Sequence, residues 1–241
     1  MDRIAVGDGL EPDYNVAPTK DVYAIFDRLP RDRAEAGAER RLATVRWGLV
    51  PSWAKEPSIG SRLINARVET LSDKPAFRRA FARRRCLLPA DGYYEWYATE
   101  LLGPRGKPVK QPFFITPADG AVLAMAGLYE VWRNRAVPDD HVDAFLWSAC
   151  VITTSAEDAL GHIHDRMPML VEPAGYDAWL DATMTSAESL RDVLVPAAPG
   201  RLRAYPVSTA VNNVRSNGPE LVAPLGAEGE PEPEPEPLFE T

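Results

Sequence analysis

A chain of 241 residues with 45% hydrophobic content is long enough to bury a sizeable core in one large domain or two small ones. It contains no run of about 18 consecutive apolar residues, which argues against a membrane-spanning helix. The acidic segment Met1–Asp13 lacks the basic and apolar regions of a secretory signal, so we expect a cytoplasmic protein. The two cysteines, Cys86 and Cys150, lie in apolar sequence and are expected to be buried free thiols. Two cysteines and three histidines are poor material for a zinc site, and we expect no metal and no cofactor.

The net charge of −8 is distributed unevenly along the chain. The segment after Gly226 contains six acidic residues and no Lys or Arg, namely Glu228, Glu230, Glu232, Glu234, Glu236 and Glu240. The rest of the chain is therefore close to neutral and can present a local basic patch, so nucleic-acid binding is not excluded. Alternating Glu and Pro cannot bury a core, and we expect a single domain over residues 1–225 and a disordered acidic tail over residues 226–241. Whether the tail has a specific role or only keeps the protein in solution stays open.

Segments rich in β-branched and aromatic residues, and bounded by Pro, Gly or Asp, predict most of the strands. They are Val22–Asp27, Leu42–Val50, Phe113–Thr116, Val122–Val131 and Phe145–Thr154. Two further strands are expected near Met169–Val171 and Arg203–Val207. Strands outnumber helices and do not alternate with them regularly, which speaks against a doubly wound parallel sheet. The predicted fold class is therefore α+β, with a mainly antiparallel, partly barrel-like sheet flanked by short helices.

Three segments predict helices. One starts at Pro75 behind a cap at Ser72 or Asp73, and two shorter ones cover Glu172–Leu180 and Ser186–Leu194. In the first helix Phe77 and Phe81 are expected to face inward. Its outward face is expected to carry Arg78, Arg79, Arg83, Arg84 and Arg85. This face either widens a positive surface or is an ordinary solvated helix face.

Polar residues embedded in hydrophobic strands are costly to bury unless they are paired or used, so they mark candidate sites. Four clusters qualify: YNVAPT at 14–19, RWGLVPSW at 46–53 followed by NARVET at 65–70, CLLPADGYYEW at 86–96, and IHDRMP at 163–168. Each has a purely structural alternative. In this alternative Asn15 only caps a turn, and Arg67 only pairs with Glu69 along a strand. Likewise, Glu95 would be an ordinary solvent-facing strand residue, and His164 would only pack beside His162. Taken singly, none of the clusters identifies a function.

Taken together, the clusters resemble the SRAP family of abasic-site processing proteins, whose older name is SOS-response-associated peptidase. The resemblance runs from about Tyr14 to about Pro224 and rests on motifs that occur in the family's order: YNVAPT, RWGLVPSW, INARVET, LLPADGYYEW, KQPFFI, AGLYEVW, TTSAED, IHDRMP and PVSTAVNNVRSNGPEL. INAR-x-E, ADGYYEW and IHDRMP in this order are a specific combination. The resemblance implies a mainly antiparallel α+β fold and a site that binds single-stranded DNA at an abasic sugar.

The resemblance also implies a covalent reaction. In the family a cysteine follows the initiator Met, and after Met removal its α-amine and thiol close a thiazolidine ring on the sugar aldehyde. Only an N-terminal cysteine offers an amine and a thiol on adjacent carbons, and an α-amine with a pKa near 8 is partly unprotonated at neutral pH. Asn15, Glu95 and His164 match the family positions around this reacting group. Glu95 is expected to transfer protons, His164 to act as a second acid or base, and Asn15 to orient the amine.

The implied partner is single-stranded DNA containing abasic sites, which would place the protein at the nucleoid when it is bound; no membrane partner is expected. Asn65, Arg67, Thr153 and His164 match positions that bind phosphates, because fixed donors on strands hold a backbone without reading its sequence. Pro18 and Trp53 match positions that act as apolar wedges against the bases beside the lesion.

This chain departs from the family at its start, which reads Met1-Asp2-Arg3-Ile4 instead of Met-Cys-Gly-Arg. Neither Cys86 nor Cys150 can substitute, since an internal cysteine has no free amine beside its thiol. We expect that the start codon was assigned too late; the alternative is a shortened relative that binds DNA without a covalent link. A peptidase using Cys86 and His164 is a third hypothesis, with self-removal of the initiator Met as the one plausible cleavage. Which DNA structures are preferred, how a crosslink is reversed and whether the chain oligomerises stay open.

Overall fold

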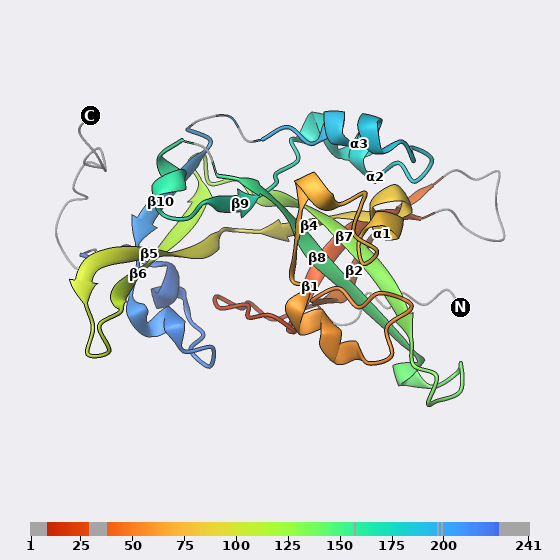
Figure 1. Cartoon of the computed structure of the whole chain (residues 1–241), viewed down its shortest axis with the longest axis horizontal. Coiled ribbons are helices and arrows are strands. Elements are labelled where there is room, and N and C mark those ends of the chain that lie inside the picture. The colour runs from red at the N-terminus through yellow and green to blue at the C-terminus, as the bar shows by residue number, and fades with distance from the viewer. Residues whose placement is uncertain (1–8, 29–37, 157, 197, 199, 227–241) are drawn as a thin grey trace.

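The computed structural model describes residues 9–28, 38–156, 158–196, 198 and 200–226 (Figure 1). The strands are β1 (Asp21–Arg28), β2 (Glu39–Trp47), β3 (Asn65–Arg67), β4 (Arg85–Ala90), β5 (Tyr93–Leu102), β6 (Pro108–Pro117), β7 (Leu123–Arg133), β8 (Phe145–Ser155), β9 (Arg166–Pro168) and β10 (Leu202–Pro206). The α-helices are α1 (Arg78–Arg83), α2 (Tyr176–Leu180) and α3 (Ala187–Val193). Short 3₁₀ helices are η1 (Pro57–Arg62), η2 (Val68–Thr70), η3 (Val142–Ala144), η4 (Asp158–His162), η5 (Pro173–Gly175), η6 (Thr209–Asn212) and η7 (Pro219–Val222). None of the helices in these parts of the chain is long and apolar enough to cross a lipid bilayer.

The larger sheet closes on itself. Its strand order is β2-β1-β4-β7-β8-β3, and β2 also pairs with β8, so that β2, β1, β4, β7 and β8 form a small barrel. Neighbouring strands are antiparallel except where β2 and β3 run parallel to β8. Among the described residues β1 and β4 share only the pair Ile25–Leu87, so the barrel wall separates at this seam.

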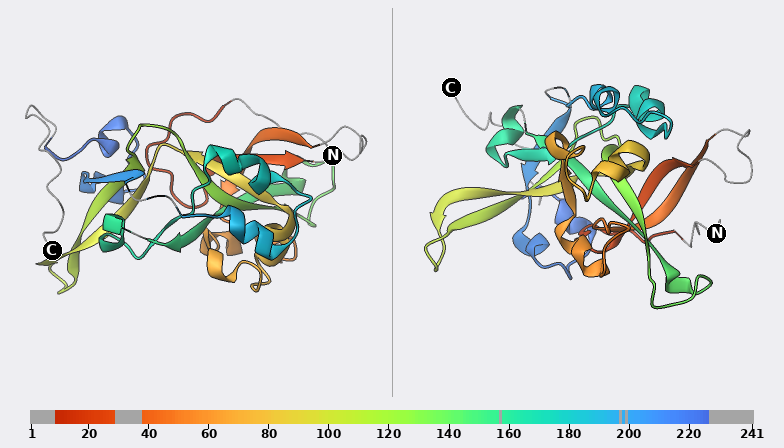
Figure 2. Two further views of the ribbon diagram at one scale, coloured as in Figure 1. Left: turned by 90° about the horizontal axis from the view of Figure 1, so that it is seen from above. Right: turned by 45° about the vertical axis from the view of Figure 1, so that its right-hand side comes forward.

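The second sheet has the order β10-β6-β5 and is antiparallel throughout. Its β5–β6 hairpin projects away from the barrel, as both views in Figure 2 show. The face of this sheet that carries Tyr94 and Phe114 packs on Val207 and Val211 of the C-terminal segment. The predicted α+β class, with a mainly antiparallel and partly barrel-like sheet, is confirmed.

Helices cover one side of the barrel, where α1, α2 and α3 lie together above β4 and β7 in Figure 1. Their apolar side chains enter a core with the barrel strands, and Trp179 of α2 is fully buried there. The indole nitrogen of Trp179 donates a hydrogen bond to the Cys86 carbonyl at 2.9 Å, which ties α2 to β4. Phe77 and Phe81 are buried in the same core, as the sequence predicted for the inward face of α1.

Several predictions about single elements need correction, among them the strand expected at Phe113–Thr116, which is Pro108–Pro117, and the helix expected at Glu172–Leu180, which is η5 followed by α2. The first helix begins at Arg78 with Phe77 as N-cap, so neither Ser72 nor Asp73 caps it, because residues 68–77 form η2 and turns. The strand expected at Met169–Val171 is β9, three residues earlier, and Leu170 adds only an isolated bridge to Met125. The strand expected at Leu42–Val50 begins at Glu39 and ends at Trp47, before Gly48 takes a φ of 126°. The sequence pattern did not resolve these boundaries.

A further correction concerns Arg85, which was expected on an exposed arginine face. It begins β4 instead and is 3% exposed. Its guanidinium donates to the carbonyls of Trp179, Phe81, Ala82 and Asp181, and so joins α1, α2 and the strand. Arg78, Arg79 and Arg83 are exposed, as expected, while Arg84 pairs with the buried Glu130. The predicted acidic tail lies almost wholly outside the described residues, apart from Gly226.

Candidate functional site

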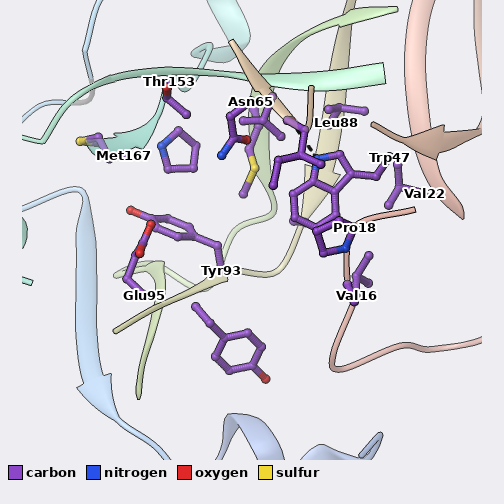
Figure 3. A pocket seen from close by; sticks show the side chains of 18 of the residues that line it. Val16, Pro18, Val22, Trp47, Asn65, Leu88, Tyr93, Glu95, Thr153 and Met167 are labelled. Carbon is purple, nitrogen blue, oxygen red and sulfur yellow. Dashed lines mark hydrogen bonds between the residues drawn. The ribbon is translucent and has the colours of Figure 1, made fainter. Parts of the chain in front are cut away.

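A large cavity opens beside the seam between β1 and β4. Its volume is about 1070 Å³, and its walls come from both sheets, from the segment that precedes β1 and from the loop after η6. Figure 3 shows that the cavity has two chemically different ends. Glu95, Thr153 and Met167 lie toward one end; the other is apolar and contains Val16, Pro18, Val22, Trp47 and Leu88. A cavity with an apolar part and a few convergent polar groups is typical of a ligand site.

The polar end of the cavity brings Glu95 and His164 together. Glu95 lies on β5, His164 lies just before β9, and the Glu95 Oε1 and His164 Nδ1 atoms are 4.0 Å apart. Two groups of Arg166 lie within hydrogen-bond distance of His164 Nδ1, the backbone N–H at 3.1 Å and the carbonyl oxygen at 3.2 Å. These contacts fix the ring orientation, and the tautomer of the ring decides which of the two is a hydrogen bond. The two side chains therefore lie close together without a direct hydrogen bond, which leaves both available to a ligand.

Burial changes the acidity of Glu95. Its side chain is 23% exposed, and burial raises the pKa of its carboxyl, while the neighbouring His164 partly opposes the increase. A buried carboxylate loses hydration, so the neutral carboxylic acid is favoured to a higher pH than in water. Glu95 is therefore protonated more readily than an ordinary glutamate, which suits a group that donates and accepts a proton.

The parallel pair β3–β8 places phosphate-binding candidates beside this carboxyl. In the register Arg67 faces Thr153 and Asn65 faces Val151, while Ala66 between them is buried. Asn65 and Arg67 consequently project from the same, exposed side of β3. Asn65, Arg67 and Thr153 all line the cavity.

Arg166 lines the cavity but was not among the site residues predicted from the sequence, although it lies in the IHDRMP motif. It donates to both Glu69 carboxylate oxygens, at 2.7 and 3.0 Å, and to the Thr153 carbonyl at 2.6 Å. Hydrogen bonding from Arg166 holds the pKa of Glu69 below its usual value. The expected structural alternative, in which Arg67 pairs with Glu69, is therefore not what the structure shows. Glu69 binds Arg166, and no ion pair of Arg67 is found in the described part of the chain.

Asn15 lies in the cavity wall and is 7% exposed. Its side-chain nitrogen donates to the carbonyls of Val211 and Asn213, each at 3.1 Å, and of Ser216 at 3.3 Å. The side chain thus holds the loop that follows η6 against the segment before β1. A hydrogen bond from the Tyr94 hydroxyl to the Tyr14 carbonyl, at 2.7 Å, fastens the same segment to β5. Neither link could be predicted, because both join residues that are far apart in the sequence.

The two expected wedges lie in different places. Pro18 lines the apolar end of the cavity, whereas Trp53 lies outside the cavity walls and is 60% exposed. Trp53 follows β2 in a turn, and its neighbour Ala54 accepts a hydrogen bond from the Trp132 indole nitrogen at 2.7 Å. The structure therefore brings together Asn15, Pro18, Asn65, Arg67, Glu95, Thr153 and His164, and leaves Trp53 on an adjacent surface.

Cys86 and Cys150 are both free and fully buried, as predicted. Neither lines the cavity, and burial raises the pKa of the Cys86 thiol well above its ordinary value. A thiol in this environment is not a nucleophile, since the thiolate is the reactive form. The position of Cys86 therefore gives no support to a peptidase that uses Cys86 with His164. Among the described residues no three His, Cys, Asp or Glu side chains are grouped so that they could hold a metal ion.

Comparison with known proteins agrees with the resemblance seen in the motifs. Residues 3–214 match the family described as SOS response associated peptidase (SRAP). The abasic site processing protein YoaM of Bacillus subtilis is 37% identical over 212 residues, which cover 88% of this chain and 85% of that protein. The abasic site processing protein HMCES of Xenopus tropicalis is 31% identical over 242 aligned positions, which cover 90% of this chain and 68% of that protein.

Solved structures show the same fold. A protein from Bordetella bronchiseptica superposes with a TM-score of 0.62 at 31% identity, over 80% of this chain and 86% of the other. A protein from Bacteroides thetaiotaomicron superposes with a TM-score of 0.64 over 76% of each chain, at 24% identity. With the motifs, the sequence match and the fold in agreement, this chain belongs to the SRAP family.

Proposed function

We propose that the cavity binds single-stranded DNA at an abasic site and holds the ring-opened sugar at its polar end. The observation that carries the proposal is the pair of Glu95 and His164, 4.0 Å apart beside the exposed donors of β3. An abasic sugar offers an aldehyde, whose reactions require acid–base groups. The two phosphates that flank the sugar are bound by cationic or neutral hydrogen-bond donors. The similarity to proteins named for abasic site processing supports this substrate.

Arg67, Asn65 and Thr153 are proposed to hold the phosphates. Because Glu69 is bound to Arg166, the guanidinium of Arg67 keeps its charge available for the DNA backbone. Pro18 and Trp53 are proposed to contact the bases on either side of the lesion. An intact duplex keeps its bases stacked and paired, so these contacts favour single strands.

The covalent step is proposed for a product whose N-terminal residue is cysteine. The α-amine adds to the aldehyde carbon to form a C–N bond, and loss of water gives an imine. The thiol then adds across the C=N bond, so that sulfur bonds to carbon and the proton goes to nitrogen. Glu95 is proposed to protonate the departing hydroxyl and later to transfer the thiol proton to the imine nitrogen, and His164 to assist the same transfers. Without such a cysteine, the same site binds DNA noncovalently.

Fluorescence anisotropy with labelled oligonucleotides tests the noncovalent part of the proposal. The chain from Met1 is titrated with an abasic single strand, an intact single strand and an intact duplex at several salt concentrations. We expect salt-dependent binding of single strands, with the abasic strand bound most tightly and the duplex at least about tenfold more weakly. Equal affinity for the abasic strand and the duplex, or the lack of any salt-sensitive binding, would contradict the proposal.

Replacement of Arg67 by Gln is expected to weaken the binding of abasic and intact single strands alike, by about tenfold. A phosphate contact carries no information on sequence or lesion, so both affinities should fall equally. The slope of log affinity against log salt should become shallower by about 0.7, the value for one phosphate contact on a single strand. Arg135→Gln, in the exposed β7–β8 loop, is the matched control and should leave both quantities unchanged. A loss confined to the abasic strand would show that Arg67 contacts the lesion itself.

A further inference from the structure

The motif PVSTAVNNVRSNGPEL, residues 206–221, has no role in the function proposed so far. In the structure it contributes η6, η7 and the loop between them, residues 213–218. Val211, Asn212 and Val214 of this region line the cavity. The region packs on the smaller sheet through Val211 and Val207, whereas Asn65 and Arg67 belong to the larger one. The loop, which packs on the smaller sheet, and β3, which belongs to the larger sheet, therefore form two walls of one cavity.

The loop is held in place by asparagine side chains. Besides the three carbonyls bound by Asn15, Asn213 accepts a hydrogen bond from the Arg215 backbone N–H at 3.1 Å. Asn212 accepts one from the Trp96 indole nitrogen at 2.7 Å. Asn217 accepts from the Tyr14 backbone N–H at 2.7 Å. Exposed loops are ordinarily mobile, but these bonds attach this one to β5 and to the segment before β1.

What this rigid loop presents to solvent is an apolar and a cationic side chain. Val214 is 60% exposed at the cavity wall, and Arg215, the next residue, is also exposed. No ion pair of Arg215 is found in the part of the chain that the structure describes. Arg215 itself lies outside the cavity lining. The loop therefore fixes the backbone so that Val214 can contact a ligand in the cavity, while Arg215 can contact the part of a longer ligand that extends beyond it.

We infer that residues 213–217 are the second wall of the DNA channel, in which Arg215 binds a backbone phosphate and Val214 contacts the adjoining sugar or base. The inference rests on the proposed function and adds to it a binding surface and two residues. A single DNA strand carries a phosphate at every nucleotide, so that Arg67 on β3 and Arg215 in the loop can bind different phosphates of the same strand. Asn15 is then a positioning residue that acts on DNA through the loop.

The test compares Arg215→Gln with the wild type and with the remote control Arg135→Gln, using intact and abasic single strands. We expect Arg215→Gln to weaken the binding of both strands by about tenfold and to make the slope of log affinity against log salt shallower by about 0.7. Affinity and slope equal to those of Arg135→Gln, in a series where the wild type binds single strands, would overturn the inference and leave the proposed function intact. If the wild type itself shows no salt-sensitive binding, the proposed function fails instead.

A double-mutant cycle tests the positioning role of Asn15. If Asn15 acts by holding Arg215 in place, Asn15→Ala removes the same contact, and adding Arg215→Gln weakens binding little further. Two independent losses that multiply would show that Asn15 does not act through the loop. Asn217→Ala removes another bond between the loop and the segment before β1 and should show the same coupling to Arg215, which keeps the test valid if Asn15→Ala does not fold.

Discussion

Replacement of Glu95 by Gln is expected to slow formation of the DNA adduct by about 10²- to 10⁴-fold in a product with an N-terminal cysteine, the range for loss of a positioned acid–base group. Gln has nearly the same shape but can neither protonate the departing hydroxyl nor accept the thiol proton. Noncovalent binding of single strands should change little, because Glu95 holds no phosphate in this account. Single-turnover kinetics on denaturing gels gives the rate, and Glu100→Gln, exposed on the same strand, is the control. Equal rates for the two variants would remove Glu95 from the mechanism.

The same variant is expected to unfold at a higher temperature than the wild type at neutral pH. Burial raises the pKa of Glu95 above its ordinary value of 4.5, so the folded state favours the protonated carboxyl. The stability that this proton contributes is present below pH 4.5 and is lost as the pH rises through the raised pKa. Gln stays neutral at every pH, so its advantage should vanish in acid. Thermal unfolding from pH 4 to 8 measures this difference, and a lower midpoint for the variant at pH 7 would contradict it.

Replacement of Arg85 by Ala is expected to lower the free energy of unfolding by about 3–5 kcal/mol, although Arg85 is remote from the proposed chemistry. Its guanidinium is the common donor to four carbonyls at the end of α1, around α2 and in the following turn. Burial lowers the pKa of Arg85 to about 10, which still leaves it charged at neutral pH. Alanine would leave these carbonyls without a donor and open a cavity beside Trp179.

Urea denaturation measures this loss, and Arg83→Ala provides the matched control. Arg83 is an exposed arginine only two residues away and should change the free energy of unfolding by less than about 0.5 kcal/mol. A change for Arg85→Ala as small as that of Arg83→Ala would mean that the carbonyls find other donors or water.

Much of the fold could be predicted because the strand signal in this chain is local. Alternation and β-branched residues mark β1, β7 and β8, whose predicted and observed bounds differ by at most two residues. The boundaries were wrong where a single residue ended an element, as at Gly48 after β2. The position of Arg85 could not be predicted, since the three consecutive arginines at 83–85 look alike in the helical pattern until α2 packs beside one of them.

The candidate site was predictable in its composition but not in its connections. The motif resemblance named Glu95, His164, Asn65 and Arg67, and the structure places all four around one cavity. The bonds of Asn15 to residues 211–216 join segments about 200 residues apart, and the bond of Arg166 to Glu69 joins segments about 100 residues apart. Local sequence carries no signal for contacts of this kind. Without them, the loop that follows η6 had no visible relation to the site.

The most direct test of covalent capture compares the product translated from Met1 with one translated from an in-frame start farther upstream, each mixed with single-stranded DNA that carries one abasic site. Intact mass establishes the N-terminal residue of each product, and a denaturing gel reveals any adduct. The account predicts a denaturant-resistant adduct with a product whose N-terminal residue is cysteine, and none with the product that begins at Met1. A correctly processed N-terminal cysteine that forms no adduct would contradict the proposed chemistry.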